Sequence, residues 1–313
     1  MIVSRLRDER GQAFVLACIA LIVLLGMSAF VLDVGSWYRT QRRLQGTTDA
    51  AALAGAQLLP NDPSGGRSIA QSYATKNGGD VAGADIVITS KFQANDTISV
   101  RAARTDPGIF SKILNINSAD ISAKATARVG PPKEALHVAP MVVFCGHSLI
   151  KNCNNNHEPE FNVSTTLDYD DLGAPGAFGM LNLDGEQGTV GSSKEAEWIL
   201  HGFDKYLPLG KYRSDPGAKF ESDNLNDALD ERIGTVLLFP VYETLDGEGQ
   251  NAEYKIIGWI GFHLTGYEVH GHSATLEGYF TEYIAQGVLS QSAPGTGGVP
   301  SSLFGVKTIQ LIE

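Results

Sequence analysis

Three histidines in the C-terminal part, His263, His270 and His272, are of a type that could do chemistry in this chain of 313 residues. Successive side chains of a strand alternate between its two faces, so His270 and His272 would share one face and could both bind a metal ion. A carboxylate from elsewhere in the chain would have to complete such a site. In the alternative interpretation, which we favour, the pair in the segment E-V-H-G-H-S flanks an exposed turn and binds nothing.

Two of the three cysteines, Cys145 and Cys153, form a C-x7-C pair. With His147 and His157 they would provide sulfur and nitrogen ligands of the kind that zinc prefers, but the usual C-x2-C spacing is missing. We favour a local disulfide that closes the loop between them, because we expect this part of the chain to lie in an oxidising compartment. The third cysteine, Cys18, lies in an apolar stretch and is expected to behave as a small apolar residue.

Short motifs with a known catalytic mechanism are missing from the sequence. It contains no G-x-S-x-G nucleophile elbow, no H-E-x-x-H pair and no glycine-rich phosphate loop. Two acidic clusters, at residues 168–171 and 223–231, do not fit the calcium-loop pattern and are expected to be solvated. We therefore expect no enzymatic activity, no catalytic or metal-binding residues, no cofactor and no small-molecule substrate. The net charge of −11 argues against nucleic acid as a partner and suits solubility outside the cell.

The longest apolar stretch, residues 13–32, contains no charged side chain over twenty residues. At about 1.5 Å per residue, a helix of this length spans the ~30 Å hydrocarbon core of a bilayer. No proline follows before Pro60, so the sequence predicts that the helix continues outside the membrane over residues 33–59, for a total of roughly 70 Å. A cleaved signal peptide would also explain the basic start, but the run is longer than a usual signal core and no A-x-A site ends it. We therefore predict an uncleaved anchor.

Charge alone does not decide the orientation of this anchor. Equal numbers of arginines flank it, with Arg5, Arg7 and Arg10 before the span and Arg39, Arg42 and Arg43 after it. Because the head, residues 1–12, is short and the remainder is much larger, an arrangement with the head in the cytoplasm and the remainder outside is the simpler one. We therefore expect a single-pass protein of the cytoplasmic membrane, with its N-terminus in the cytoplasm, its C-terminal domains outside and the lipid bilayer as one partner.

Beyond the span, apolar and small residues recur at spacings of three and four from Val34 to Leu58, which places them on one stripe of the helix. Toward its end the stripe consists of alanine and glycine, including Ala51 and Gly55. Small side chains allow another backbone to approach closely, either a helix of a second protein or this chain's own next domain. The sequence leaves both alternatives open. Asp33 closes the apolar run, and a carboxylate at a membrane boundary needs no function if it reaches water.

The same region resembles a known family in three motifs: R-x-x-R-G-Q-A before the span, L-D-V-G-S-W-Y at its end and R-R-L-Q-x-x-x-D-A-A-A-L-A-G-A after it. They are similar to the N-terminal domain of TadE/TadG-like proteins of the Flp (Tad, tight-adherence) pilus-assembly systems, relatives of type IV pili. The resemblance runs from Arg10 to about Leu59 and implies a bitopic protein whose bulk lies outside the cytoplasmic membrane. It also implies contacts with other pilus or pilus-assembly proteins through the helix. The candidate packing and assembly residues are Gln45, Asp49, Ala51 and Gly55.

One position departs from the processed pilins of this type, in which a glycine is followed five residues later by a glutamate. The residue five positions after Gly11 is Leu16, so the sequence leaves cleavage after Gly11 open.

A weaker resemblance to Tad-associated envelope proteins lies in the C-terminal part. It is carried by A-F-G-M-L-N-L-D-G, V-L-L-F-P-V-Y and G-W-I-G-F-H-L-T-G-Y, and it implies no known activity.

The chain after the helix is expected to divide at Gly130-Pro131-Pro132, because prolines interrupt strands and stiffen a linker. Residues 60–130 predict a small pilin-like α+β unit beside the long helix, with helices at 66–77 and 107–114 and strands at 84–90, 97–103 and 119–129. Residues 131–313 predict a mainly β extracytoplasmic domain. Its expected elements are strands at 136–145, 233–243, 254–270, 276–285 and 306–313, helices at 192–203 and 224–232, and a flexible loop at 286–302. The predicted fold class is α+β.

These observations together predict a membrane-anchored structural component of a Tad/Flp-type pilus apparatus, either a minor pilin or an assembly factor. Two alternatives would use the same anchor: an extracytoplasmic enzyme with a metal site on His263, His270 and His272, and an adhesin or ligand-binding domain. Sugar-binding surfaces often expose aromatic rings. Trp198 and Trp259, however, lie in stretches predicted as helix and strand, where burial is expected.

Overall fold

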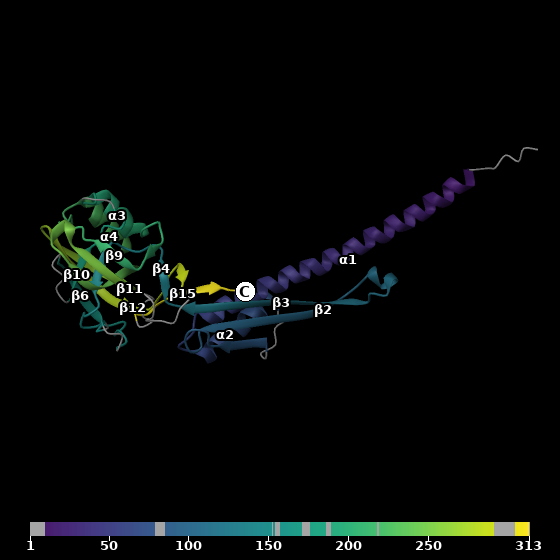
Figure 1. Ribbon diagram of the computed structural model, residues 1–313, viewed down its shortest axis with the longest axis horizontal. Helices are drawn as coiled ribbons and strands as arrows, with labels where there is room; N and C mark the ends of the chain where they lie inside the picture. The colour runs from purple at the N-terminus through teal and green to yellow at the C-terminus, as the bar shows by residue number, and fades with distance from the viewer. Residues whose placement is uncertain are drawn as a thin grey trace, which may run out of the picture.

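The protein, described here by a computed structural model, is elongated, with one long helix that projects from two β-rich units (Figure 1). The structure describes residues 10–78, 85–151, 153, 157–170, 176–185, 189–217, 219–290 and 304–312. The expected α+β class is confirmed, with the long helix first, a small helix next and a mainly β remainder. The expected cytoplasmic head, apart from its last residues, and most of the loop expected at 286–302 lie outside the described residues.

The long helix, α1 (Arg10–Ala56), contains 47 residues and is therefore about 70 Å long. It ends three residues before the predicted Leu59, in a turn that precedes Pro60, whose ring cannot continue a helix. The next helix, α2 (Pro63–Asn77), begins earlier than the expected residue 66. Asp62 caps it by accepting a hydrogen bond from the Gly65 amide at 2.8 Å, and a proline at the first helical position favours this start.

A five-stranded sheet in the order β1-β2-β3-β15-β13 forms the body of the first unit. Its strands are β1 (Ile86–Thr89), β2 (Thr97–Pro107), β3 (Ser118–Gly130), β15 (Val306–Leu311) and β13 (Tyr283–Ile284). β2 and β3 form a long hairpin, and a short 3₁₀ helix, η2 (Ser111–Leu114), lies in its loop where the sequence predicts a helix over 107–114. Alternate residues of the hairpin, such as Ile98, Val100 and Ala125, are buried in one cluster with the alanines of α1 and α2.

The last strand, β15, is part of this first sheet and not of the C-terminal domain in which the sequence places it. It pairs antiparallel with the end of β3, from Thr308 opposite Gly130 to Leu311 opposite Ala127, and parallel with β13. An unpaired strand edge exposes backbone N–H and C=O groups. β15 provides hydrogen-bond partners for the backbone groups at the end of β3. Alternation in the sequence predicts a strand but not its partner. The two units are therefore linked by more than one passage of the chain.

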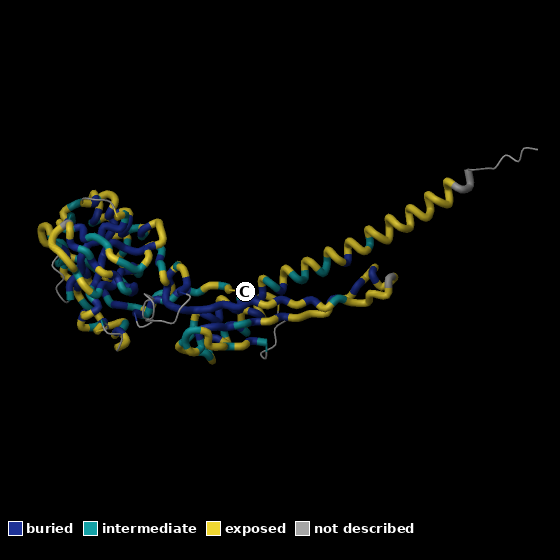
Figure 2. The backbone as a smooth tube through the Cα atoms, viewed as in Figure 1, coloured by how far each residue is buried: buried dark blue, intermediate teal, exposed yellow. Residues whose placement is uncertain are grey.

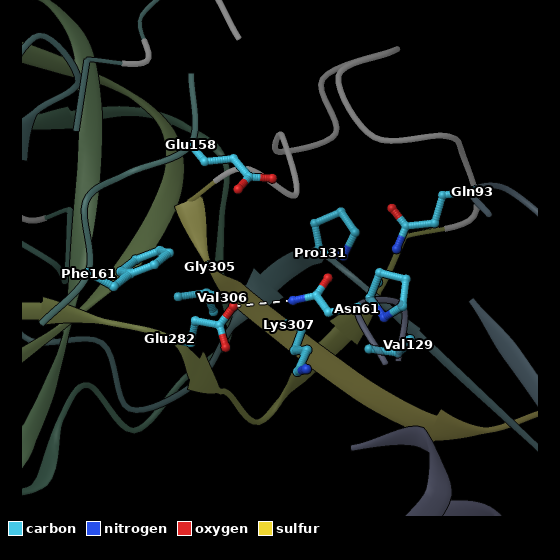
Figure 3. A pocket seen from close by; sticks show the side chains of 12 residues that line it. Asn61, Gln93, Val129, Pro131, Glu158, Phe161, Glu282, Gly305, Val306 and Lys307 are labelled. Carbon is cyan, nitrogen blue, oxygen red and sulfur yellow. Dashed lines mark hydrogen bonds between the residues drawn. The ribbon is translucent and has the colours of Figure 1, made fainter. Parts of the chain in front are cut away.

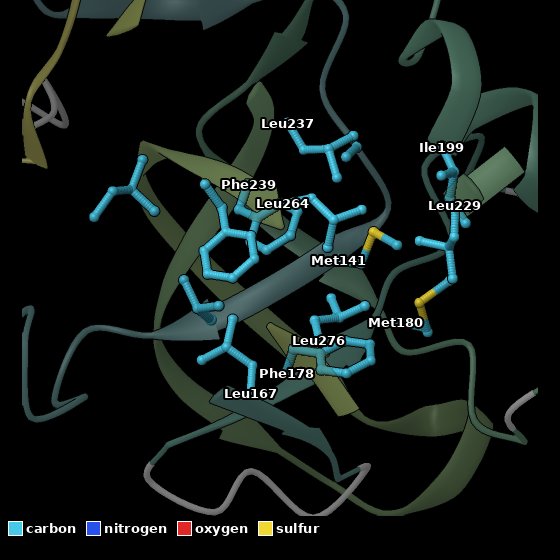
Figure 4. Packing of buried hydrophobic residues seen from close by; sticks show 14 of the residues in the cluster. Met141, Leu167, Phe178, Met180, Ile199, Leu229, Leu237, Phe239, Leu264 and Leu276 are labelled. Carbon is cyan, nitrogen blue, oxygen red and sulfur yellow. The ribbon is translucent and has the colours of Figure 1, made fainter. Parts of the chain in front are cut away.

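The second unit is a closed barrel. The described strands follow the order β10-β5-β7-β6-β12-β11-β9. Because β10 also pairs with β11, the six strands from β10 to β11 form a closed ring, and β9 lies outside that ring. These strands are β5 (Met141–Phe144), β6 (Ser164–Tyr169), β7 (Ala177–Met180), β9 (Gly210–Arg213), β10 (Val236–Asp246), β11 (Glu253–His270) and β12 (Ser273–Thr281). Large apolar side chains fill the interior, among them Phe178, Phe239 and Leu276 (Figure 4). The helices α3 (Ser192–His201) and α4 (Asp223–Arg232) contribute Ile199 and Leu229 to the same cluster.

Two predicted strands of this unit have different outcomes. The strand expected at 136–145 is divided into β4 (Pro132–Ala135) and β5, because His137 adopts a left-handed φ of 58° and Pro140 lacks an amide hydrogen. β4 joins β14 (Gly287–Leu289) and β8 (Leu207–Pro208) in a small separate sheet. By contrast, β11 continues as one strand over 254–270, with register shifts beside Gly258 and Gly266, two of the glycines expected to mark bulges. A short 3₁₀ helix, η3 (Gly249–Asn251), lies in the loop before it.

Candidate functional site

The first half of α1 is apolar and exposed on all sides. Within Ala13–Ala56, the most apolar window of 18 residues has a mean hydropathy of 2.9, and none of it is buried inside the protein. Apart from its grey start, Figure 2 shows nearly all of this half as exposed. Apolar surface of this extent is unfavourable in water. This half of α1 therefore needs a lipid bilayer or other apolar helices around it.

The second half of α1 is buried against the first sheet and α2. Ala51 has no exposed surface, and Gly55 is buried beside it. A Cβ atom at position 55 would lie 2.6 Å from Ile98 Cδ1 and 2.8 Å from the carbonyl oxygen of Gly66, which is closer than real Cβ contacts. Of the two alternatives for the small-residue stripe, the structure shows packing on the chain's own next unit. The candidate assembly residues Ala51 and Gly55 are thus occupied within the chain.

The other two candidate assembly residues, Gln45 and Asp49, also have partners within the chain. Gln45 Nε2 donates to Asp49 Oδ1 at 2.7 Å and to the carbonyl oxygen of Lys124 on β3 at 3.3 Å. One turn nearer the membrane, Gln41 Nε2 donates to the carbonyl oxygen of Ser122 at 3.0 Å. These bonds follow β3 along α1 and hold the hairpin parallel to the helix.

Asp33 has a role that the sequence analysis missed. Its side chain is buried, and Oδ2 accepts hydrogen bonds from the backbone amides of Ile109, Phe110 and Ser111 at 3.0, 2.8 and 2.6 Å. Further along α1, Thr40 Oγ1 donates to the carboxylate of Asp106 near the end of β2. Asp33 thus holds the tip of the β2–β3 hairpin against α1 instead of reaching water. No local signal predicts this, because the partners lie more than seventy residues away.

The candidate disulfide is present in the structure, with Cys145 and Cys153 bonded and their Cα atoms 4.9 Å apart. Their sulfur atoms are therefore not available to the alternative metal site. His147 is buried, its Nδ1 accepts a hydrogen bond from the Leu149 amide at 3.1 Å, and burial lowers the pKa of its imidazole. His157, the fourth member of that alternative, is exposed.

The three C-terminal histidines do not converge. The ring of His263 stacks on Tyr279 at a centroid distance of 4.7 Å, while His270 and His272 are exposed beside Glu268 and Glu221 respectively. Over the part of the chain that the structure describes, no group of three or more His, Cys, Asp or Glu side chains is placed to hold a metal ion. The metal site of the enzyme alternative thus has no geometric support at these residues.

Among the acidic groups that the structure describes, Glu195 has a strongly raised pKa. Lys219 Nζ lies 2.9 Å from Glu195 Oε1 and 3.0 Å from Asp215 Oδ2, and both carboxylates are almost fully buried. Burial raises the pKa of Glu195 to about 8, and the neighbouring Asp215 adds to the rise while Lys219 opposes it. The sequence carried a signal for this cluster, because Glu195 shares a helix face with the buried Trp198 and Ile199. Through Lys219, the two carboxylates join α3 to the segment around residue 215.

A pocket of about 160 Å³ lies where the two units meet (Figure 3). Asn61 Nδ2 donates to Glu282 Oε1 across it at 3.3 Å, and Phe161 and Pro131 supply apolar walls. Lys307 Nζ donates to the carbonyl oxygen of Leu59 at 3.1 Å, and burial lowers the pKa of this lysine. None of the described residues that line the pocket is a nucleophile paired with a base. The polar contacts link the turn after α1 to β15 and the barrel.

The two halves of α1 define the class of protein: a folded, β-rich body on a helix that is long and apolar enough to cross a membrane. Residues 11–58, which comprise nearly all of α1 and the turn after it, match the family model described as "Putative Flp pilus-assembly TadE/G-like". The resemblance inferred from the three motifs is thereby confirmed for the N-terminal region, and it supports a role associated with Flp/Tad pili. No curated protein and no solved structure matches the chain.

Proposed function

We propose that this protein is a membrane-anchored structural component of a Tad/Flp-type pilus apparatus, acting as a minor pilin or as an assembly factor and not as an enzyme. The observation that carries the proposal is the family match over α1, the helix whose first half is exposed and apolar. In the proposed arrangement residues 13–32 cross the cytoplasmic membrane. The N-terminus lies in the cytoplasm, and both β-rich units lie outside.

Contacts that α1 makes with other pilus or pilus-assembly proteins would use the face of the helix that the chain leaves exposed. Beyond the span this face carries Val34, Tyr38 and Arg42, and Arg42 Nε donates to the Tyr38 hydroxyl at 3.0 Å. Tyrosine and arginine are enriched at protein interfaces because each combines a large contact area with directional hydrogen bonds. Within the span, nothing lies within 4 Å of a Cβ built on Gly26, so a second helix can approach there closely.

The proposed role requires a stable connection between the anchor and the body. Leu44, Ala52 and Ala56 of α1 are buried in the cluster shared with β2, β3 and α2. The helix therefore cannot detach from the first unit without exposing that cluster. Movement of α1 would be passed toward the barrel through the pairing of β3 with β15 and through the hydrogen bond from Lys307 to the Leu59 carbonyl oxygen.

The adhesin alternative gains no support from the tryptophans of the barrel unit. Trp198 and Trp259 are both buried, as the sequence predicts, so neither ring is available to stack on a sugar.

The test is an immunoblot of sheared surface fibres beside the membrane fraction, read for location and apparent size. Signal in the fibres would make the protein a minor pilin, and full-length protein confined to the membrane would make it an assembly factor. A mass lower by the first eleven residues would show cleavage after Gly11 despite Leu16. Soluble protein outside the cell, absent from both fractions, would overturn the proposed anchor.

A further inference from the structure

The tip of the β2–β3 hairpin, residues 108–117, lies beside α1 at the point where the apolar span ends (Figure 1). Asp33, the first residue after the span, has 3% of its surface exposed and accepts hydrogen bonds from three consecutive amides of the tip. Carboxylate–amide bonds of this kind are stronger than bonds between neutral groups. The tip is thus held at the same level along α1 as the end of the span.

The surface of this tip is apolar. Ile109 is 69% exposed, Ile113 86% and Phe110 41%, and Ile116 is exposed beside them. Lys112 carries the one charge between residues 108 and 117. Away from the tip, the exposed positions of the same hairpin are mostly polar, namely Arg101, Arg104 and Thr105 on β2 and Ser118, Asp120, Ser122 and Lys124 on β3. The change from polar to apolar surface along the hairpin therefore coincides with the end of the span on α1.

The height of the tip matches the boundary of a bilayer. The twenty apolar residues 13–32 span about 30 Å, which is the thickness of the hydrocarbon core, and the headgroup regions add several ångströms on each side. Asp33 follows the span directly, so the side chains of the tip lie within the headgroup layer or at its contact with the acyl chains. Isoleucine and phenylalanine are stabilised there, and a lysine extends its amine toward lipid phosphates.

We propose that this hairpin tip inserts into the surface of the bilayer that α1 crosses, with Ile109, Phe110 and Ile113 in contact with lipid. The proposal rests on α1 spanning the membrane and goes beyond the pilus role. Asp33 acts as a positioning residue, since it holds the tip at the height of the headgroups. Two membrane contacts, one helix and one hairpin, then fix the tilt of the folded body relative to the membrane, which a single helix would leave free.

The experiment measures the depth of a fluorescent label in the full-length protein, reconstituted in phosphatidylcholine vesicles. Ile113→Cys in a Cys18→Ser background receives an environment-sensitive label, and Cys145 and Cys153 stay bonded and unlabelled. The matched control is Ile233→Cys, an isoleucine that is also exposed but follows α4 in the barrel unit. In a separate sample, the protein without substitutions is labelled at its native Cys18, which is exposed within the span and reports on the anchor itself. We expect emission at shorter wavelength, and several-fold stronger quenching by lipids with a nitroxide near the headgroup, at position 113 than at position 233.

Equal quenching at positions 113 and 233, with strong quenching at Cys18, would overturn the hairpin proposal and leave the membrane anchor intact. Loss of quenching at Cys18 as well would show that α1 does not span the vesicle membrane. Protection of position 113 from aqueous iodide without quenching by nitroxide lipids would mean that the tip contacts protein, and would also overturn the proposal. In the Asp33→Ala variant we expect weaker lipid quenching at position 113, and retained quenching would contradict the positioning role of Asp33.

Discussion

Replacement of Gly55 by leucine tests whether the small-residue stripe of α1 serves the chain's own fold. A Cβ at this position would lie 2.6 Å from Ile98 Cδ1, 2.8 Å from Gly66 O and 3.0 Å from Ala70 Cβ. Ile98 can change its rotamer, but the Gly66 carbonyl belongs to the backbone of α2. The two helices would therefore have to move apart.

The size of the effect follows from two opposing contributions. Overpacking typically costs about 1–3 kcal/mol, and the approach to the backbone oxygen of Gly66 places this substitution at the upper end of that range. Leucine has a helix propensity better than that of glycine by about 1 kcal/mol. We expect a net loss of about 2 kcal/mol, which corresponds to about thirtyfold in the opening equilibrium. The matched control is Gly26→Leu, because nothing lies within 4 Å of a Cβ at that position.

Hydrogen exchange of the detergent-solubilised full-length protein measures this effect locally. In Gly55→Leu we expect the amides of β2 and β3 to exchange about thirtyfold faster, while those of β11 in the barrel keep their wild-type rates. In Gly26→Leu both sets should be unchanged, and any loss of association with pilus components would then report contacts of the span. Equal protection of β2 and β3 in the two variants would refute the argument that the stripe is needed within the chain.

Two further predictions concern the barrel unit. Because the pKa of Glu195 is raised from 4.5 to about 8, the folded chain keeps a proton that the unfolded chain releases, so the free energy of unfolding should fall as pH rises between these values. The slope is at most about 1.4 kcal/mol per pH unit, and denaturant titrations at several pH values should show it diminished in Glu195→Gln but not in Glu197→Gln, whose side chain is exposed on the same helix. A slope that is the same in wild type and Glu195→Gln would count against the buried proton. Separately, replacing Cys145 and Cys153 by serine opens a loop with a sequence separation of 8, and the chain-entropy model predicts a loss of about 2.5 kcal/mol and a lower Tm in thermal unfolding. An unchanged Tm would show that the bond contributes little to stability.

The arrangement of α1 explains how one helix can serve two environments. Its first half presents apolar side chains on every side, as a helix surrounded by lipid requires. Its second half is amphipathic, with alanines against the sheet and Tyr38, Arg42 and Arg43 on the exposed face. The change occurs close to Asp33, which accepts hydrogen bonds from the hairpin tip.

Local patterns in the sequence determined much of the first unit. The charge-free run predicts the span, Pro60 predicts the end of the helix, and alternation predicts β1, β2 and β3 close to their observed bounds. The helices at 192–203 and 224–232 were also predicted close to their observed bounds. These elements depend on residues that are close together in the sequence, so local patterns are sufficient to predict them.

The tertiary structure alone decided which surfaces meet. The stripe around Ala51 and Gly55 is suited equally to a foreign helix and to α2, and only the folded chain shows that α2 occupies it. The pairing of β15 with β3, the closure of the barrel by β10 and β11, and the burial of Asp33 against the hairpin tip all join residues far apart in the sequence. Such contacts depend on the summed packing and hydrogen bonding of many distant residues, and no local periodicity encodes them.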